Sequence, residues 1–192
     1  VSSNLLIPRS VKYENEEFTV TKIFQNSFSK SNLIKTITFD ENSELCLIGE
    51  NSFSHLLIES ITIPSKVKKI EKNTFNFTTN MKTIEFEKNS ELETIENSCF
   101  SSSSIENVLL PSKLKRISKF TFLYCKHLKK VDFSTDSELE IIENSAFFGC
   151  SIESISIPSS IIEFQDGWCE SISYLKDIRI IQRNQKNIDY YD

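Results

Sequence analysis

The stretch that decides the fold is ITIPSKVKKIEKNTF, residues 61–75. Ile61 and Ile63 lie two positions apart, so their side chains point to the same face of a strand. The proline that follows ends the strand, because proline cannot donate a hydrogen bond to a ladder. The stretch then continues to Ile70 and, five residues later, Phe75. This order of strand, proline, isoleucine and phenylalanine predicts one turn of a repeat.

Both halves of this turn recur along the chain. An apolar motif of the form L-x-x-L-x-L occurs seven times, centred on Ile37, Ile61, Ile84, Val108, Val131, Ile155 and Ile178, with spacings that alternate between 24 and 23. An isoleucine stands five positions before a phenylalanine six times, at Ile23/Phe28, Ile48/Phe53, Ile70/Phe75, Ile95/Phe100, Ile117/Phe122 and Ile142/Phe147. These marker phenylalanines are 25, 22, 25, 22 and 25 residues apart, which indicates a 47-residue double repeat.

The two halves differ in the link between the strand and the marker isoleucine. One half uses Ile-Pro-Ser or Leu-Pro-Ser, and the other uses a longer link ending in Ser-Glu-Leu at residues 43–45, 90–92 and 137–139. No single turn can bury its apolar side alone, so stacked neighbours must form the core. We therefore predict a leucine-rich-repeat solenoid of seven to eight turns, with a parallel sheet on the concave face and irregular or short helical return segments. We expect all 192 residues to form one domain, with an N-terminal turn that carries a hairpin-like insertion (1–30), alternating repeats (31–172), and a last turn or cap that is either complete or truncated (173–192).

These turns resemble the BspA-like leucine-rich repeats. Residues 63–75 and the stretch from Ile157-Pro158 onward are close matches to their turn pattern, and residues 13–20 resemble the hairpin-like insertion of an early repeat. The resemblance covers residues 5 to 181. It implies a surface protein of the kind found in oral anaerobes and mucosal protozoan parasites, many of them adhesins for host proteins or other cells. The family supplies no catalytic residues.

Composition excludes several classes of function. The net charge is −5, whereas nucleic-acid binders carry a basic excess, so no nucleic acid is expected as a partner. No apolar run approaches the ~20 residues of a membrane-spanning helix, so this segment is not expected to insert into a membrane. Three glycines leave little for phosphate-cradling loops.

Charged residues recur in register with the repeat. Four positions before successive marker isoleucines, the sign alternates through Glu44, Lys66, Glu91, Lys113 and Glu138. Stacked turns would place these side chains about one strand spacing, ~4.8 Å, apart, where opposite charges favour the register. This charge ladder explains much of the lysine cluster at residues 113–130. A residual excess at Lys126, Lys129 and Lys130 leaves a glycan-binding patch as an alternative.

Three patterns suggest chemistry and fall short of it. Cys125 stands two positions before His127, but no orienting group or oxyanion donor accompanies them. Two loop segments, 40–44 and 87–91, place oxygen ligands at alternate positions but lack the glycine and further carboxylates of a calcium loop. The five cysteines form no C-x-x-C pair, although Cys125 and Cys150 occupy equivalent positions on adjacent turns, which suits either free thiols or a disulfide. We expect no catalytic, cofactor-binding or metal-binding residues, and no cofactor.

The expected binding surface is the outer side of the concave sheet. Its residues flank the buried strand positions and are mostly small and polar: Thr36, Thr38, Ser60, Thr62, Thr83, Glu85, Asn107, Leu109, Lys130, Asp132, Ser154, Ser156, Asp177 and Arg179. Such a face suits a broad, weak contact, because tight protein hot spots favour Trp, Tyr and Arg.

The resulting functional prediction is a non-enzymatic protein-binding module. It would act in cell-surface adhesion, at the surface or secreted, on a host extracellular-matrix, cell-surface or bacterial protein. The alternatives are a cytoplasmic scaffold and the glycan binder. If the tail at residues 188–192 is the cut edge of a longer array, its exposed apolar end would also allow an end-to-end dimer.

Overall fold

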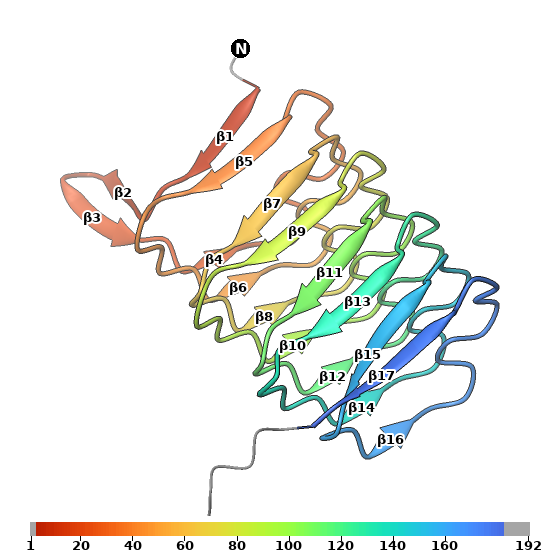
Figure 1. Ribbon diagram of the computed structural model, residues 1–192. Coiled ribbons are helices and arrows are strands. Elements are labelled where there is room, and N and C mark those ends of the chain that lie inside the picture. Colours follow the sequence, from red (N-terminus) through yellow and green to blue (C-terminus); the bar gives the residue numbers. More distant parts are fainter. Residues whose placement is uncertain (1–2, 183–192) are drawn as a thin grey trace, which may run out of the picture.

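The computed structural model describes residues 3–182 as a stack of turns that each contribute one long and one short strand (Figure 1). The long strands from the third turn onward form a six-stranded parallel sheet in the order β17-β15-β13-β11-β9-β7. They are β7 (Ser60–Ile63), β9 (Thr83–Phe86), β11 (Asn107–Leu110), β13 (Lys130–Phe133), β15 (Ser154–Pro158) and β17 (Asp177–Ile181). Two more, β1 (Asn4–Ile7) and β5 (Thr36–Phe39), pair in a separate two-stranded sheet that lies beside β7 (Figure 1). The predicted parallel solenoid is confirmed.

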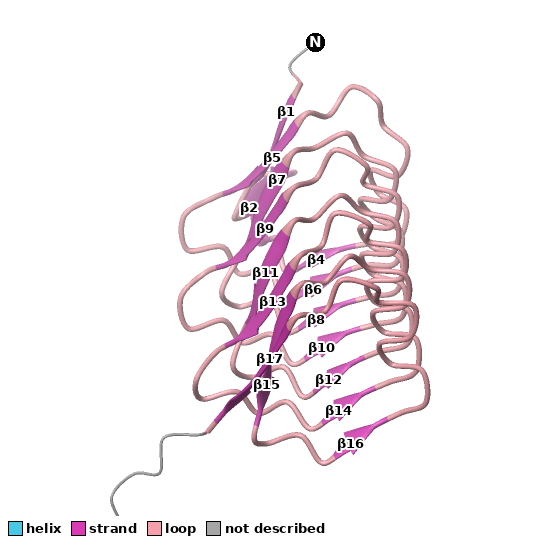
Figure 2. Ribbon diagram, turned by 45° about the vertical axis from the view of Figure 1, so that its right-hand side comes forward, coloured by secondary structure: helices cyan, strands magenta, loops and turns pink. Residues whose placement is uncertain are grey.

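A second sheet runs along the return segments (Figure 2). It contains seven parallel two-residue strands, of which the first six end on the marker isoleucines: β4 (Lys22–Ile23), β6 (Leu47–Ile48), β8 (Lys69–Ile70), β10 (Thr94–Ile95), β12 (Arg116–Ile117), β14 (Ile141–Ile142) and β16 (Glu163–Phe164). None of residues 3–182 lies in a helix, so the return segments are strands and turns rather than short helices. Adjacent turns hydrogen-bond through both sheets, which fixes their register.

A hairpin projects from the N-terminal end of the stack (Figure 1). It pairs β2 (Ser10–Tyr13) with β3 (Glu16–Thr19) in antiparallel register. Glu14 and Asn15 connect the strands with φ angles of 48° and 68°, as a two-residue hairpin turn of this hand requires. The hairpin resembles the insertion predicted for residues 13–20 and begins three residues earlier.

The core is a ladder of stacked phenylalanines. Phe53, Phe75, Phe100, Phe122 and Phe147 are fully buried, and their ring centroids stack at 5.2–5.5 Å on successive turns. The alternate residues of the long strands, such as Ile61 and Ile63, bury their side chains against the same core. The ladder ends on Trp168, whose ring meets Phe147 edge-on at 6.3 Å. A phenylalanine in every turn thus joins the repeats into one core.

The backbone around each marker phenylalanine has a regular strain. The residues two positions before and two positions after it adopt positive φ in turn after turn. Around Phe53, the backbone N–H groups of Asn51, Phe53 and His55 donate to carbonyls of the next turn at 3.1, 3.1 and 2.9 Å. The position two after the phenylalanine therefore lines up along the stack in left-handed conformation, at Lys30, His55, Phe77, Ser102, Tyr124 and Gly149.

The charge ladder forms in the first turns. Lys66 Nζ lies 2.6 Å from the Glu44 carboxylate, and this hydrogen-bonded pair lowers the pKa of Glu44. Glu91 pairs at 3.5 Å with Lys68 rather than with Lys66, so this contact leaves the predicted row. Among the described residues, Lys113 has no ion pair within 4 Å. The ladder is therefore confirmed at Glu44 and Lys66 but does not continue as one row.

The last turn is open. Ile178 and Ile180 in β17 occupy the positions that are buried in preceding strands, yet both are exposed. The tail at 188–192, predicted as a cap or cut edge, lies outside the described residues.

Candidate protein-binding face

The solvent side of the long strands carries two parallel rows of side chains. Strand register, together with the equal place of each residue in its repeat, gives two rows: Thr36, Ser60, Thr83, Asn107, Lys130, Ser154 and Asp177 in one, and Thr38, Thr62, Glu85, Leu109, Asp132, Ser156 and Arg179 in the other. Here this surface is called the long-strand face. It collects the fourteen predicted positions on one side, because strand residues two apart share a face. Asn4 and Leu6 of β1 extend the rows by one strand and were not predicted, since the first apolar motif is centred on Ile37.

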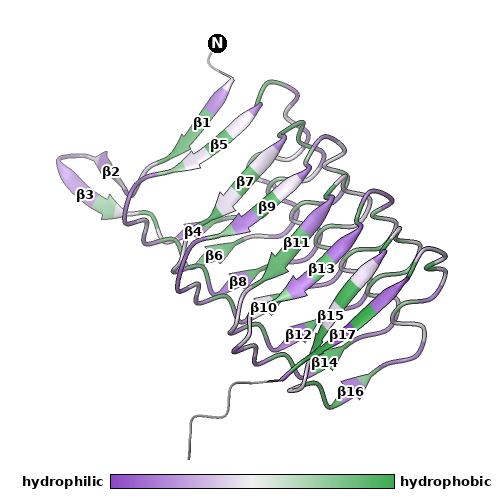
Figure 3. Ribbon diagram, viewed as in Figure 1, coloured by the Kyte–Doolittle hydropathy of each residue, from purple (hydrophilic) through white to green (hydrophobic). Residues whose placement is uncertain are grey.

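The middle of the long-strand face is hollowed around one apolar side chain. A depression of about 660 Å³ is lined by β9, β11 and β13, including Glu85, Leu109 and Asp132. Leu109 is 59% exposed, although its neighbours across the ladder are charged or polar. Figure 3 shows β11 as hydrophobic at its C-terminal half, beside more hydrophilic segments of β9 and β13. The structure thus presents a single leucine within a polar field.

Two ion pairs hold four of the five charged residues of this face. Lys130 Nζ lies 2.5 Å from Asp132 Oδ2, and Arg179 Nε lies 2.6 Å from Asp177 Oδ2. Each pair joins residues two apart on one strand, so both partners point to solvent on the same side. Each pair places opposite charges together and orients a long side chain on the face.

One predicted member of the face is not accessible. Ser156 is buried between its two neighbouring strands. Its hydroxyl donates to Asp132 Oδ1 of β13 at 3.0 Å, and Arg179 of β17 stands opposite it on the other side. The half-buried members are Asp132, Ser154 and Asp177, and the remaining ten predicted residues are exposed.

The Cys125 and His127 pair of the sequence does not form a site, and the cysteines are unpaired thiols. Cys125 is fully buried and its Sγ donates to the Phe100 carbonyl at 3.0 Å, whereas His127 is exposed. All five cysteines are free thiols. The hydrogen bond with Cys125, together with burial, raises the pKa of the Cys150 thiol, and burial raises that of Cys99. Cys125 and Cys150, on adjacent turns, therefore contact each other as thiols and do not form a disulfide.

In the loops at 40–44 and 87–91, carboxylate oxygens accept hydrogen bonds from backbone N–H groups. Asp40 Oδ2 accepts from the Arg9 N–H at 2.8 Å, and Glu87 Oε2 accepts from the Ser65 N–H at 2.8 Å. Within residues 3–182, no group of three or more His, Cys, Asp or Glu side chains is placed to hold a metal ion. No helix of the described part is long and apolar enough to cross a membrane. Of the lysines of the glycan alternative, Lys130 is engaged by Asp132.

Comparison with known proteins assigns the repeat. A model of the BspA type leucine-rich repeat region, in six copies, matches residues 9–129 and 93–191. The chain belongs to the BspA-type leucine-rich repeat family. No curated protein matches it.

Solved structures of bacterial proteins share this repeat fold. The pneumococcal vaccine antigen PcpA is 31% identical with a TM-score of 0.70, covering 92% of this chain and 40% of its own. A leucine-rich repeat protein of Bacteroides ovatus is 19% identical with a TM-score of 0.67, covering 93% of this chain and 59% of its own. A leucine-rich cell surface protein of Faecalibacterium prausnitzii is 17% identical with a TM-score of 0.50, covering 92% of this chain and 69% of its own. The BspA-type chain thus spans less than half of PcpA and about three fifths of the Bacteroides protein.

Proposed function

We propose that this BspA-type repeat is a non-enzymatic module that binds a host or bacterial protein through its long-strand face, at the cell surface. The observation that carries the proposal is the hollow around Leu109, a solvent-exposed leucine ringed by Glu85, Lys130 and Asp132. An apolar centre with a polar rim is the usual anatomy of a protein interface.

The magnitudes favour a weak contact for each module. Burying a leucine side chain completely contributes ~1.5–3 kcal/mol, and Leu109 is a little more than half exposed in the free protein, so it can contribute only part of that range. The ion pairs on the face are exposed and each contribute about 0.2–1 kcal/mol. We infer that strong adhesion depends on several turns or several copies binding together.

The proposed location at the cell surface rests on the relatives. Two of the similar structures belong to a pneumococcal vaccine antigen and a cell surface protein of Faecalibacterium prausnitzii. A repeat module that contacts other molecules outside the cell would be consistent with the descriptions of both proteins.

A binding screen against extracellular-matrix proteins, followed by one designed variant, tests the proposal. Glu85, Asp132 and Arg179 are replaced together by alanine, which removes two acids and one base from the long-strand face. The matched control replaces Glu93, Glu140 and Lys115, which are exposed with the same charges but lie outside the long strands. Binding to the matrix protein should weaken at least about tenfold in the first variant, equivalent to about 1.4 kcal/mol, and stay unchanged in the control. If both variants bind like the unmodified protein, the long-strand face is not the binding surface.

A further inference from the structure

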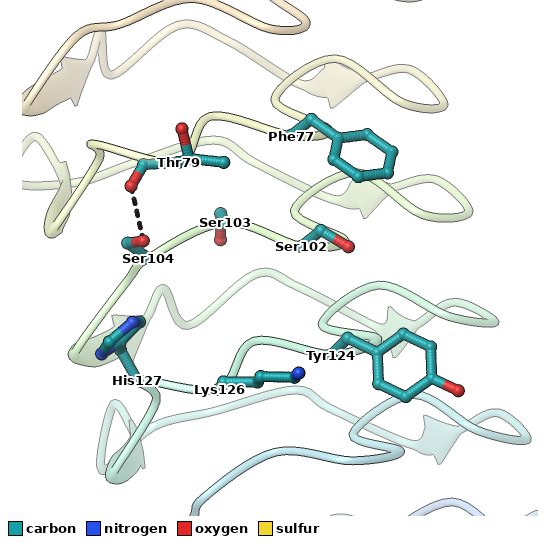
Figure 4. Close-up of a pocket in the computed structure, with 8 residues that line it drawn as sticks. All are labelled: Phe77, Thr79, Ser102, Ser103, Ser104, Tyr124, Lys126 and His127. Atoms are coloured by element: carbon teal, nitrogen blue, oxygen red, sulfur yellow. Dashed lines mark hydrogen bonds between the residues drawn. The ribbon is translucent and has the colours of Figure 1, made fainter.

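A second surface lies at the turns that follow the buried phenylalanines. Two hollows of about 390 and 550 Å³ share Thr79, Ser104 and His127, so they form one continuous groove across four turns. Figure 4 shows one end of it, with the rings of Phe77 and Tyr124 on the same rim and Ser102 on the turn between them. This surface is called the turn groove, and it is separate from the long-strand face.

The two rings occupy backbone positions that disfavour them. Phe77 and Tyr124 both have φ of 55°, a conformation in which bulky side chains are uncommon because of steric repulsion. Both are nearly half exposed, at 46% and 48%, so neither ring serves the core. The equivalent positions of neighbouring turns carry lysine, histidine, serine and glycine, so the fold itself does not require an aromatic residue there. Two exposed rings at such positions, both lining one groove, point to a role in binding.

Neighbouring side chains hold each ring in place. His55 stacks on Phe77 with ring centroids 5.0 Å apart and 9° between planes. Phe148 meets the Tyr124 ring edge-on at 5.6 Å, and Gly149 lets that ring lie against its backbone, since an added Cβ would stand 2.7 Å from Tyr124 Cδ1. The rings are therefore ordered before any ligand arrives, which lowers the entropic cost of binding.

The polar groups of the groove match sugar hydroxyls. Ser102 and Ser104 line the groove between the rings, and Thr79 and Tyr124 add further hydroxyls, each able both to donate and to accept. The third serine, Ser103, is buried, and its hydroxyl is hydrogen-bonded to Cys125 Sγ. Ser104 already donates to the Thr79 carbonyl at 2.6 Å, which ties two turns of the groove together. Lys126 is the charged residue of the aromatic end, and no carboxylate lines that end. Apolar ring faces, neutral hydroxyls and one cation together suit a saccharide with an acidic unit.

We propose that the turn groove binds an acidic oligosaccharide, with sugar faces against Phe77 and Tyr124 and a carboxylate at Lys126. The rings stand two turns apart, about 10 Å at the strand spacing of the solenoid. That distance exceeds one sugar ring, so the ligand that covers both contains at least two linked units. The other end of the groove, where Glu59 and Glu106 lie near Lys82, has mixed charge and suits neutral units.

Titration with three hexasaccharides tests the site by calorimetry. Hyaluronan hexasaccharide is acidic and unsulfated, chitohexaose is neutral, and heparin hexasaccharide is sulfated. Phe77→Ala and Tyr124→Ala should each weaken hyaluronan binding about tenfold, and Lys126→Met should reduce it to the level of chitohexaose. The matched control is Phe120→Ala, because Phe120 is also an exposed aromatic at positive φ (39%, φ 60°) but does not line the groove. Thermal unfolding of each variant checks that it is folded.

The outcomes are distinguishable. Hyaluronan binding that both ring substitutions weaken and Phe120→Ala spares supports the turn groove. Equal affinity for chitohexaose contradicts the acidic class. Hyaluronan binding that is insensitive to both ring substitutions overturns the site, as does an absence of hyaluronan binding at millimolar concentration; heparin binding with the same insensitivity would then identify attraction to surface lysines.

Discussion

The phenylalanine ladder supports a quantitative prediction for Phe100→Ala. Phe100 is fully buried between Phe75 and Phe122, with ring centroids at 5.4 and 5.3 Å. A buried phenylalanine removes roughly 150 Å² or more from water, which at ~25 cal/mol per Å² corresponds to about 4 kcal/mol. The cavity left behind keeps the cost in the range of ~3–5 kcal/mol. We expect the free energy of unfolding to fall by about 4 kcal/mol.

Phe28→Ala is the matched comparison. Phe28 is half-buried and stacks on one ring only, Phe53, at 5.7 Å. Because each turn contacts only its neighbours, this substitution should cost about 1–2 kcal/mol. Urea unfolding followed by circular dichroism gives both values, and fluorescence of Trp168 checks that the chain unfolds as one unit. Equal costs for the two variants, or a loss below about 1.5 kcal/mol for Phe100→Ala, would refute a core built from stacked rings.

Three further predictions concern charge, thiols and glycine. The pKa of Glu44 is lowered by its hydrogen bond to Lys66, so the pair stabilises the fold at neutral pH, and this contribution disappears as pH falls through that lowered pKa. Lys66→Met should therefore reduce stability to urea at pH 7 but not in strong acid. An equal loss of stability at both pH values would contradict the pairing. A thiol reagent should modify only the half-buried Cys46 and Cys169 in the native protein, and all five cysteines after unfolding. Modification of fewer than five cysteines in the unfolded protein would indicate a disulfide. Gly149→Ala should lower the free energy of unfolding by about 1–2 kcal/mol, because φ is +69° and the new Cβ meets the Tyr124 ring; an unchanged melting temperature would contradict both causes.

Much of the architecture follows from the spacing of a few residues. Alternation at Ile61 and Ile63 identifies a strand, and its recurrence at a regular spacing predicts a parallel stack. A shift of one residue in strand pairing would turn the isoleucines to solvent. The same alternation identifies the outward rows of the long-strand face. Sequence could not show that Ser156 is buried, since that depends on the position of Asp132 on the neighbouring strand.

The second sheet and the turn groove were not predictable in the same way. The return strands contain two residues each, too few for any alternation to appear, although the marker isoleucines stand in six of them. The left-handed positions hold residues as different as Lys30, Phe77 and Gly149, so no shared chemistry reveals them. Phe77 and Tyr124 both stand two positions after a marker phenylalanine, so the repeat aligns them, but only the structure shows that both rings are exposed and line one groove.

The most direct test of the proposed binding face is a comparison of two leucine substitutions. Leu109 and Leu33 are 59% and 60% exposed, but Leu109 lies in the hollow of the long-strand face and Leu33 in a turn outside the strands. Each is replaced by aspartate, and the dissociation constant for the matrix protein found in the screen is measured by surface plasmon resonance. The proposal predicts that Leu109→Asp weakens binding at least about tenfold, or about 1.4 kcal/mol, while Leu33→Asp binds like the unmodified protein. Unchanged affinity of Leu109→Asp, with both variants folded, would contradict it.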